Sequence, residues 1–328
     1  MKKVRVAHFG IAHDHSTATL ETVRNLKDIY EVVGICEPDA QTRESLGGAK
    51  IYQGLPWLSE EELFSRNDID AVLCEGHELR SVSDAQKCID KGWHVHLDKP
   101  GGTDLAAFER LLKSADAKGL TMQMGYMFRW NTAFKYALDS VKSGKLGRIV
   151  GIDASFSRMD TPEKRKWLGQ FPGGMMFYLG CHIIDTILLL NGMPDRVVPF
   201  NHSSDCDNDG SMDTAFAVLD YPHGACAVRV HACEVNGMAK RNLKIVGTLG
   251  TIEIQPMEYP TIIYEALLKD ANYPWNTDGA RRIFPGYVSG RYDEMMTEFA
   301  ACVRGEMTNP YTSEYELNLQ RVLLEACK

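Results

Sequence analysis

The sequence predicts two consecutive domains: a doubly wound α/β domain, then an α+β domain with a large, mostly antiparallel open sheet. Strands alternate with helices up to about residue 125, which indicates a parallel sheet with helices on both faces. Long strands joined by short turns follow, and these are typical of an antiparallel sheet. We therefore expect a first domain at 1–125 and a second at 126–328. The second should carry helices on one face of its sheet, and its C-terminal helices could pack back on the first domain.

Size and composition exclude several classes of protein. The 328 residues suffice for two full cores, and 44% apolar with 24% charged residues is ordinary for a globular chain. A net charge of −8 without a run of basic residues argues against nucleic acid or a membrane as partner. No stretch approaches 18 uncharged apolar residues, and Arg5 and His8 interrupt the apolar start, so neither a membrane span nor a signal peptide is expected. The nine cysteines contain no C-x-x-C pair, which favours reduced thiols in a cytoplasmic protein.

The elements of the first domain follow from apolar periodicity and turn residues. The expected strands are 4–9, 31–36, 50–52, 69–74, 93–97 and 120–125. The expected helices are 17–26, 40–47, 58–64, 81–91 and 103–118. Ser59 is a candidate cap of the third helix, because Glu62 follows it three residues later.

A dinucleotide-binding turn is expected after the first strand, although its glycine fingerprint is reduced. Gly10 holds the first glycine position, Ala12 the second, and His15 stands at the third. Such a turn binds a pyrophosphate through free N–H groups at a helix N-terminus. Glu37 follows the second strand, where an acid accepts hydrogen bonds from a ribose, and Asp39 is the competing acid. The alternative is an ordinary turn between a strand and a helix.

Lys99 is the candidate centre of the chemistry. It ends the strand 93–97 in an Asp-Lys-Pro-Gly-Gly run, and Pro100 biases it toward an extended backbone. The lysine is thus presented at the carboxyl end of a strand, where open α/β sheets bind their ligands. The alternative is a solvated surface lysine in a turn.

The second domain is predicted from its longer strands. The expected strands are 149–158, 196–203, 213–221, 224–234 and 241–254. The expected helices are 131–143, 177–191, 290–305 and 313–327, and 268–289 is expected to be an irregular loop. On the helix 177–191, Tyr178, His182 and Asp185 would share one face at i, i+4 and i+7. Three polar groups on one face favour an acid–base cluster, whereas a lone histidine there would be structural.

Two H-x-H patterns, His13 with His15 and His94 with His96, raise the question of a metal. No third ligand accompanies either pair at a recognisable spacing. We therefore expect no metal.

Four further segments resemble one known family. Leu97–Pro100 looks like its Glu-Lys-Pro motif, and Gly125–Asn131 like the segment that links its two domains. Gly173–Asp185 looks like its motif of two glycines followed by an aspartate, a histidine and a second aspartate, and Gly247–Glu253 like its late strand pair. Over essentially its whole length the chain resembles the Gfo/Idh/MocA family of NAD(P)-dependent oxidoreductases.

The resemblance implies an N-terminal Rossmann domain, a substrate-binding C-terminal domain, and a homodimer or homotetramer formed through the open sheet. It also implies that Lys99 stabilises the reacting oxygen while His182 accepts its proton near neutral pH. Asp185 would orient His182 or contact a substrate hydroxyl, or else form a structural hydrogen bond. Several departures signal an altered substrate, or a member that binds nucleotide without turnover. Tyr178 replaces an aspartate, Asp98 replaces the glutamate before Lys99, and the loop 75–80 differs from the family pattern.

The predicted activity is hydride transfer between a nicotinamide cofactor and a secondary alcohol of a sugar, cyclitol or derivative. The residues assigned to catalysis are Lys99, His182, Tyr178 and Asp185. The residues assigned to the cofactor are Gly10, Ala12, His13, His15, Glu37, Glu75, His77, Asp98, Lys99 and Arg129. The residues assigned to the substrate are Lys99, Asn131, Trp167, Tyr178 and His182. NAD is favoured over NADP because Glu37 would repel a 2′-phosphate. The alternatives are a sensor or scaffold without net activity, and an internal redox cycle on tightly held NAD.

Overall fold

The computed structural model describes residues 2–258, 260–270, 281–285 and 290–328. The chain divides into two compact units, one of residues 1–127 with 289–320 and one of residues 128–288 with 321–328. The division falls within the last helix, α11 (Ser313–Ala326). No helix in the described part of the chain is long and apolar enough to cross a membrane.

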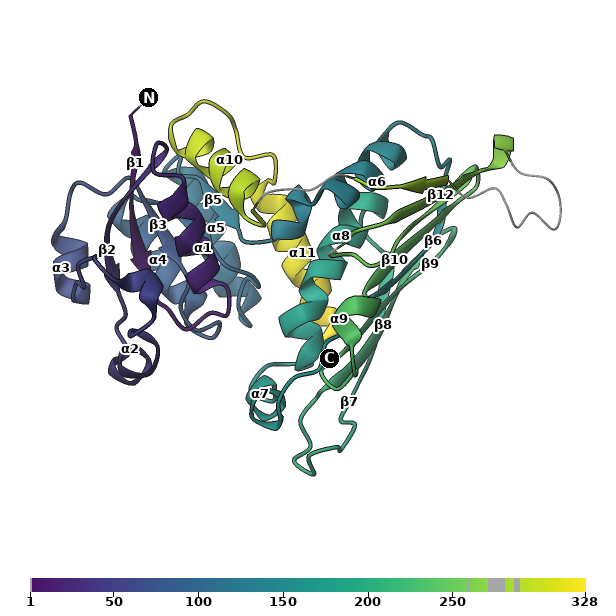
Figure 1. The fold of residues 1–328 in the computed structure, drawn as a ribbon, viewed down its shortest axis with the longest axis horizontal. Coiled ribbons are helices and arrows are strands. Elements are labelled where there is room, and N and C mark those ends of the chain that lie inside the picture. Colours follow the sequence, from purple (N-terminus) through teal and green to yellow (C-terminus); the bar gives the residue numbers. More distant parts are fainter. Residues whose placement is uncertain (1, 259, 271–280, 286–289) are drawn as a thin grey trace. The chain divides into compact units, whose positions relative to one another are not determined.

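The first unit is built on a five-stranded parallel sheet with the order β2-β1-β3-β4-β5 (Figure 1). Its strands are β1 (Val4–Phe9), β2 (Tyr30–Cys36), β3 (Ala71–Cys74), β4 (His94–Leu97) and β5 (Met122–Met124). The inner strands β1 and β3 are almost wholly buried, as expected for strands covered on both faces. The predicted doubly wound fold is confirmed.

Helices cover both faces of this sheet. Its α-helices are α1 (Ser16–Asn25), α2 (Ala40–Leu46), α3 (Glu60–Ser65), α4 (Ser81–Lys91), α5 (Leu105–Ala117) and α10 (Asp293–Val303), to which α11 adds most of its length. Helix α1 packs against α10, and α4 packs against α5. Ser59 and Glu62 form the predicted capping box at α3. The predicted strand at 50–52 is wrong: Lys50–Tyr52 is a 3₁₀ turn that buries Tyr52.

The second unit is built on an eight-stranded sheet with the order β13-β12-β11-β10-β6-β9-β8-β7. Its strands are β6 (Ile149–Ser155), β7 (Arg196–His202), β8 (Thr214–Tyr221), β9 (Gly224–His231), β10 (Asn242–Gly247), β11 (Gly250–Ile254), β12 (Ile263–Leu267) and β13 (Arg281–Ile283). All described pairs are antiparallel except β6 with β9. This confirms the mostly antiparallel sheet.

Two details of the second sheet differ from the sequence prediction. The expected strand 241–254 is a hairpin, because the chain turns back at Thr248 and Leu249 between β10 and β11. The expected loop 268–289 contains a 3₁₀ turn (Leu268–Asp270) and the strand β13, while 271–280 and 286–289 lie outside the described residues. Strand β12 was not predicted.

One face of this sheet carries the core of the unit. On β8 the side chains of Ala215, Ala217 and Leu219 are buried, whereas those of Phe216 and Val218 are only half-buried. Helix α8 (Cys181–Asn191) packs against β6 and β9, and α6 (Thr132–Lys142) packs against α8 (Figure 1). A short helix, α7 (Pro162–Leu168), and a four-residue helix, α9 (Gly237–Lys240), complete the described helices of the unit.

The expected α-helix 177–191 is wrong in its first turn. Met176–Gly180 is a π-helix, and the α-helix begins only at Cys181. A π-helical turn contains more residues than an α-helical turn, so Tyr178 does not stand directly above His182 as regular spacing would require. Short π-helical turns occur frequently at functional sites.

Candidate functional site

The turn after β1 is held by a glycine-to-glycine contact. Gly10 has a φ of +83°, and a Cβ at this position would overlap the main chain of Gly76. Glycine is therefore required here both for the backbone conformation and for the close approach of the loop after β3. The first position of the predicted fingerprint thus has a structural role.

Several N–H groups of this turn are already bonded inside the protein. The N–H of Ile11 donates to Glu37 Oε2 at 2.7 Å. The N–H of His13 donates to the carbonyl of Glu75 at 3.0 Å, and the N–H of His15 donates to His13 Nδ1 at 3.1 Å. In a dinucleotide-binding turn such groups hold the pyrophosphate. This arrangement was not predicted, because the acceptors come from three different parts of the chain.

Glu37 and Asp39 have different partners. The second oxygen of Glu37 accepts from the N–H of Asp39 at 2.9 Å, and Nη2 of Arg80 lies 3.7 Å from the same oxygen. The carboxylate of Glu37 is almost fully buried, whereas the Arg80 side chain is 42% exposed. Asp39 caps α2 by accepting from the N–H of Thr42 at 2.7 Å, which lowers the pKa of its carboxyl group. Asp39 is therefore a helix cap in this structure.

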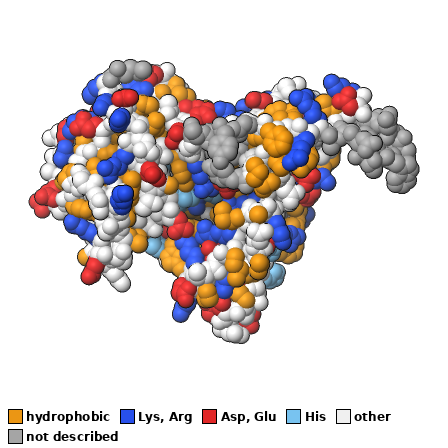
Figure 2. Space-filling model, in the orientation of Figure 1, with side chains coloured by type: hydrophobic (Ala, Val, Ile, Leu, Met, Phe, Trp, Pro, Cys, Tyr) orange, Lys and Arg blue, Asp and Glu red, His pale blue; other side chains and the backbone are white. Residues whose placement is uncertain are grey.

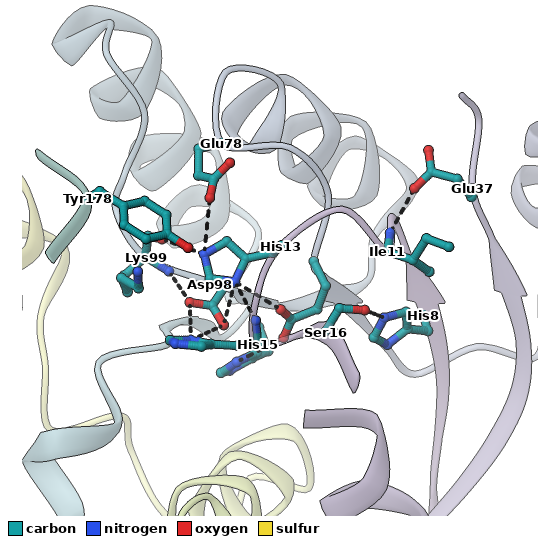
Figure 3. A network of polar contacts seen from close by, with 12 residues as sticks. His8, Ile11, His13, His15, Ser16, Glu37, Glu78, Asp98, Lys99 and Tyr178 are labelled. Atoms are coloured by element: carbon teal, nitrogen blue, oxygen red, sulfur yellow. Dashed lines mark hydrogen bonds and ion pairs between the residues drawn. The ribbon is translucent and has the colours of Figure 1, made fainter. Parts of the chain in front are cut away.

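Polar side chains gather where β1, β3 and β4 end (Figure 3). Strands β3 and β4 pair with Leu73 opposite His96 and Cys74 opposite Leu97, so Glu75 and Asp98 follow side by side. Alternate residues of a strand point to one face of a sheet, so His96 and Asp98 share a face with Glu75. All three side chains are buried.

His13 and His15 extend this cluster from the turn after β1. The Nδ1 of His15 lies 3.1 Å from both carboxylate oxygens of Asp98, and the Nδ1 of His13 lies 3.5 Å from Asp98 Oδ2. In Figure 3 the imidazole of His13 lies between Glu78 and Asp98, with its Nε2 3.6 Å from Glu78 Oε1. Burial lowers the pKa of His13 to about 3, so its ring is neutral at physiological pH.

Glu75 and His96 form the deepest part of the cluster. The Nδ1 of His96 lies 2.9 Å from the side-chain oxygen of Gln123, while its Nε2 faces Glu75 Oε1 at 3.9 Å. Burial, followed by the charge of Asp98, raises the pKa of Glu75 well above its ordinary value. Asp98 is buried too, but His13, His15 and Lys99 hold its pKa well below the ordinary value. A proton shared by this pair therefore resides on Glu75.

Lys99 follows this cluster directly. Its side chain is buried, and its main-chain N–H donates to Asp98 Oδ1 at 2.7 Å. It is therefore not the solvated surface lysine of the alternative interpretation. His77, by contrast, is partly exposed, and its Nδ1 accepts from the N–H of Leu79 within its own loop at 3.2 Å.

The second unit contains the other predicted cluster. Asp185 accepts from Arg129, with Nη2 2.8 Å from Oδ1 and Nε 3.0 Å from Oδ2, and both side chains are buried. The ring of His182 lies edge-on to Phe128, with centroids 5.2 Å apart. Arg129 was assigned to the cofactor and Asp185 to catalysis, and their pairing with each other was not predicted.

The environment of Tyr178 is cationic and aromatic. The Nζ of Lys164 lies 3.3 Å from its hydroxyl oxygen and 3.7 Å from the ring centroid of Trp167. The rings of Trp167 and Tyr178 meet edge-on at 5.2 Å. Asn131 caps α6 by accepting from the N–H groups of Ala133 and Phe134. Lys99 belongs to the first unit and Tyr178, His182 and Asp185 to the second, so their convergence on one substrate stays a prediction.

His96, Glu78 and Gln123 were not among the predicted site residues, and no metal was expected at the H-x-H pair of His94 and His96. The available signal was the alternation His94-Val95-His96-Leu97-Asp98, which places His96 and Asp98 on one face of a strand. The partner Glu75 becomes apparent only once β3 is paired with β4.

A parallel doubly wound sheet whose first turn meets an acid at the end of the second strand defines a dinucleotide-binding domain. The comparisons agree with this class. Residues 4–126 match the family described as "Oxidoreductase family, NAD-binding Rossmann fold", and residues 134–253 match the GFO/IDH/MocA C-terminal domain. The chain belongs to the Gfo/Idh/MocA family of oxidoreductases.

Curated relatives are distant in sequence. YhhX, an uncharacterized oxidoreductase of Escherichia coli, is 29% identical over 59% of this chain and 55% of its own length. The scyllo-inositol 2-dehydrogenase (NADP⁺) IolW of Bacillus subtilis is 30% identical over 49% of this chain and 45% of its own length. The chain thus spans about half the length of these two relatives.

Solved structures share the fold over nearly the whole chain. An oxidoreductase of Thermotoga maritima has a TM-score of 0.79 at 19% identity, covering 99% of this chain and 96% of its own. KijD10, a 3-ketoreductase of Actinomadura kijaniata solved with TDP-benzene and NADP, has a TM-score of 0.79 at 20% identity, with the same coverage. At these identities the likeness concerns the fold alone.

Proposed function

We propose that this protein transfers a hydride between a nicotinamide cofactor and a secondary alcohol of a sugar, cyclitol or derivative. The observation that carries the proposal is the position of Lys99, buried at the carboxyl end of β4 in the NAD-binding domain of an oxidoreductase family. An ammonium held there can stabilise the negative charge that develops on an alcohol oxygen as the hydride leaves. When bound, the cofactor accepts or supplies the hydride.

His182 is the proposed base for the hydroxyl proton. An imidazole is the side chain that most often serves as a general base close to neutral pH. Its helix is anchored by the buried pair of Arg129 and Asp185, one turn further along α8. In this proposal Asp185 positions the helix face that carries His182, and its charge is balanced by Arg129.

The substrate class rests on the family and on the surroundings of Tyr178. Relatives named as acting on inositol and on xylose place polyols and sugars first, although each matches only about half of this chain. Trp167, which is half-buried, offers an aromatic face, and the buried Tyr178 beside it has a hydroxyl group; both suit a ring that carries hydroxyls. Lys164, beside both rings, would favour an acidic group on the substrate.

NAD is the proposed cofactor, with Glu37 as the reason. Its carboxylate lies at the end of β2, where it would repel a 2′-phosphate. Arg80 lies beside it and weakens that repulsion, and the relatives named above include NADP-dependent enzymes. The preference is therefore expected to be modest.

The test is a screen of sugars, cyclitols and their oxidised forms for formation or consumption of NADH and NADPH. Lys99→Ala serves as the inactive reference, and Lys118→Ala, far from the site on the surface after α5, serves as the matched control. A substrate turned over by the native protein and Lys118→Ala, but not by Lys99→Ala, would support the proposal. Turnover that persists in Lys99→Ala would contradict it.

A second candidate, nucleotide binding without net turnover, is favoured by one observation. The N–H groups of Ile11, His13 and His15 are bonded within the protein and not available to a pyrophosphate. Bound nicotinamide that no substrate reduces would support this candidate. Product formed without net NADH, with the cofactor retained, would instead indicate an internal redox cycle.

The open face of the second sheet is proposed to form a homo-oligomer. Phe200 is 46% exposed on β7 and lies against Phe216 of β8, whose ring is covered by the guanidinium of Arg229 at 4.5 Å. Light scattering of the full chain tests this proposal.

A reducing, cytoplasmic location is proposed because none of the nine cysteines, all in the described part of the chain, forms a disulfide. On the face shown in Figure 2, acidic and basic side chains are interspersed, and no nucleic-acid partner is proposed.

A further inference from the structure

Glu75, His96 and Asp98 hold their ligand-type atoms within 4.8 Å of one another, at the carboxyl ends of β3 and β4. We propose that these three side chains bind a divalent first-row transition-metal ion such as Zn²⁺. The site lies entirely within the first unit, and it goes beyond hydride transfer, which needs no metal ion of its own.

The unsatisfied polar atoms of this cluster are the first argument. Among the described residues, neither carboxylate oxygen of Glu75 has a hydrogen-bond partner. The Nε2 of His96 has no hydrogen-bond partner among these residues either. Glu75 and His96 are both fully buried, with 0% exposure. Buried polar atoms are normally satisfied by protein groups or water, so three orphaned atoms in one place point to a missing partner.

The orientation of His96 is the second argument. Its Nδ1 lies 2.9 Å from Oε1 of Gln123, an acceptor, which fixes the proton on Nδ1. The lone pair on Nε2 is thereby directed toward Glu75 Oε1, 3.9 Å away. Metal-binding histidines usually donate their other ring N–H to an oxygen acceptor in this manner.

The distance between His96 and Glu75 agrees with a metal ion between these two ligands. Ligand atoms at about 2.0–2.2 Å from an ion lie about 3 to 4.4 Å from each other, depending on the angle. The 3.9 Å between His96 Nε2 and Glu75 Oε1 is too long for a hydrogen bond and falls within that range. One imidazole and two carboxylates suit Zn²⁺, Fe²⁺ or Mn²⁺ better than a soft ion.

Charge is the third argument. The carboxylates of Glu75 and Asp98 are buried close together. Asp98 has His15 and the main-chain N–H of Lys99 as partners, whereas a negative charge on Glu75 would be uncompensated. A divalent cation would balance both charges, and His13 lies beside the three ligands, with its Nδ1 3.7 Å from Glu75 Oε2. Without the ion, a proton on Glu75 or a trapped water must replace it.

The test measures binding of Co²⁺ and Zn²⁺ to the full chain, purified without a histidine tag and stripped with a chelator. Calorimetry is expected to show one equivalent of Zn²⁺, and Co²⁺ should give a visible absorption band that Zn²⁺ removes. Glu75→Gln and His96→Gln should weaken binding about 100-fold or more, since loss of an outer-shell partner alone costs about 10–100-fold.

His94→Gln is the matched control. His94 belongs to the same H-x-H pattern on β4, but its Nδ1 accepts from the N–H of Thr121 at 2.9 Å, away from the cluster. The His94→Gln variant should bind Zn²⁺ as tightly as the native chain does. Equal losses in His94→Gln and His96→Gln, or unchanged binding by Glu75→Gln, would overturn the proposal.

A measurement on the native chain keeps the test independent of whether the variants fold. X-ray absorption of the Co²⁺ complex should show at least one imidazole and several oxygen ligands. Failure of the native chain to bind one equivalent, or a spectrum without imidazole, would overturn the proposal. These readouts need no cofactor or substrate, so they leave the proposed hydride transfer to be judged separately.

Discussion

Arg129 and Asp185 form a buried, bidentate ion pair, with Nη2 2.8 Å from Oδ1 and Nε 3.0 Å from Oδ2. The two residues are 56 positions apart, one directly before α6 and the other in the middle of α8. The pair joins the 3₁₀ turn Met127–Trp130, which precedes α6, to helix α8. It therefore supports the part of α8 that carries His182.

Breaking this pair should destabilise the protein strongly. Asp185→Ala leaves the Arg129 guanidinium buried without its carboxylate, and such a loss typically costs about 3–5 kcal/mol. Urea unfolding followed by circular dichroism measures it. The double variant Arg129→Met with Asp185→Leu should be less destabilised than Asp185→Ala. A double variant at least as unstable as the single one would contradict this account.

Gly10 should tolerate no side chain. Gly10→Ala places a methyl group against the main chain of Gly76 at a positive φ, so we expect a loss of about 2 kcal/mol or more in unfolding free energy. Gly48→Ala is the control, because a Cβ there meets no atom within 4 Å. Thermal or urea unfolding compares them. Equal stability of the two variants would show that the approach of Gly76 does not constrain the turn.

Glu37→Ala should narrow the difference between the binding affinities of the protein for NAD and for NADP. It removes the charge that opposes a 2′-phosphate, and it also removes the acceptor of the Ile11 N–H, so NAD affinity should fall about tenfold. Fluorescence titration with both reduced cofactors measures it, with Asp39→Asn as a neighbouring control. Equal or tighter NADP binding by the native chain would remove the proposed NAD preference.

Stability should fall at mildly acidic pH partly through His8. Burial, followed by the nearby His96, lowers the pKa of His8 to about 3, while the unfolded chain binds this proton near pH 6.5. The stabilisation is thus complete above pH 6.5 and is lost as the pH falls toward 3. Between pH 7 and pH 5 this histidine alone should lower the unfolding free energy by about 2 kcal/mol.

The measurement compares urea unfolding of the native chain and His8→Gln at pH 7 and pH 5. Glutamine can still hydrogen-bond Ser16, whose hydroxyl lies 2.9 Å from Nε2 of His8. The variant should lose about 2 kcal/mol less than the native chain on acidification. The same loss in both proteins would show that His8 does not take up the proton on unfolding.

Local patterns predicted most of the elements. Helix α4 begins and ends at the predicted residues, because its apolar spacing and Gly92 at its end are local signals. The 3₁₀ turn Lys50–Tyr52 and the π-helix Met176–Gly180 were missed, because short apolar runs do not distinguish these turns from strands and α-helices.

The sequence by itself determined the class of fold, the turn at Gly10 after the first strand and the place of Lys99 at a strand end. Apolar periodicity and turn chemistry depend only on neighbouring residues, so one chain suffices to read them. The tertiary structure alone decided that Glu75 meets Asp98 and His96, and that Arg129 meets Asp185. Those meetings depend on which strands pair, in which register, and on how helices pack, and no spacing along the chain encodes them.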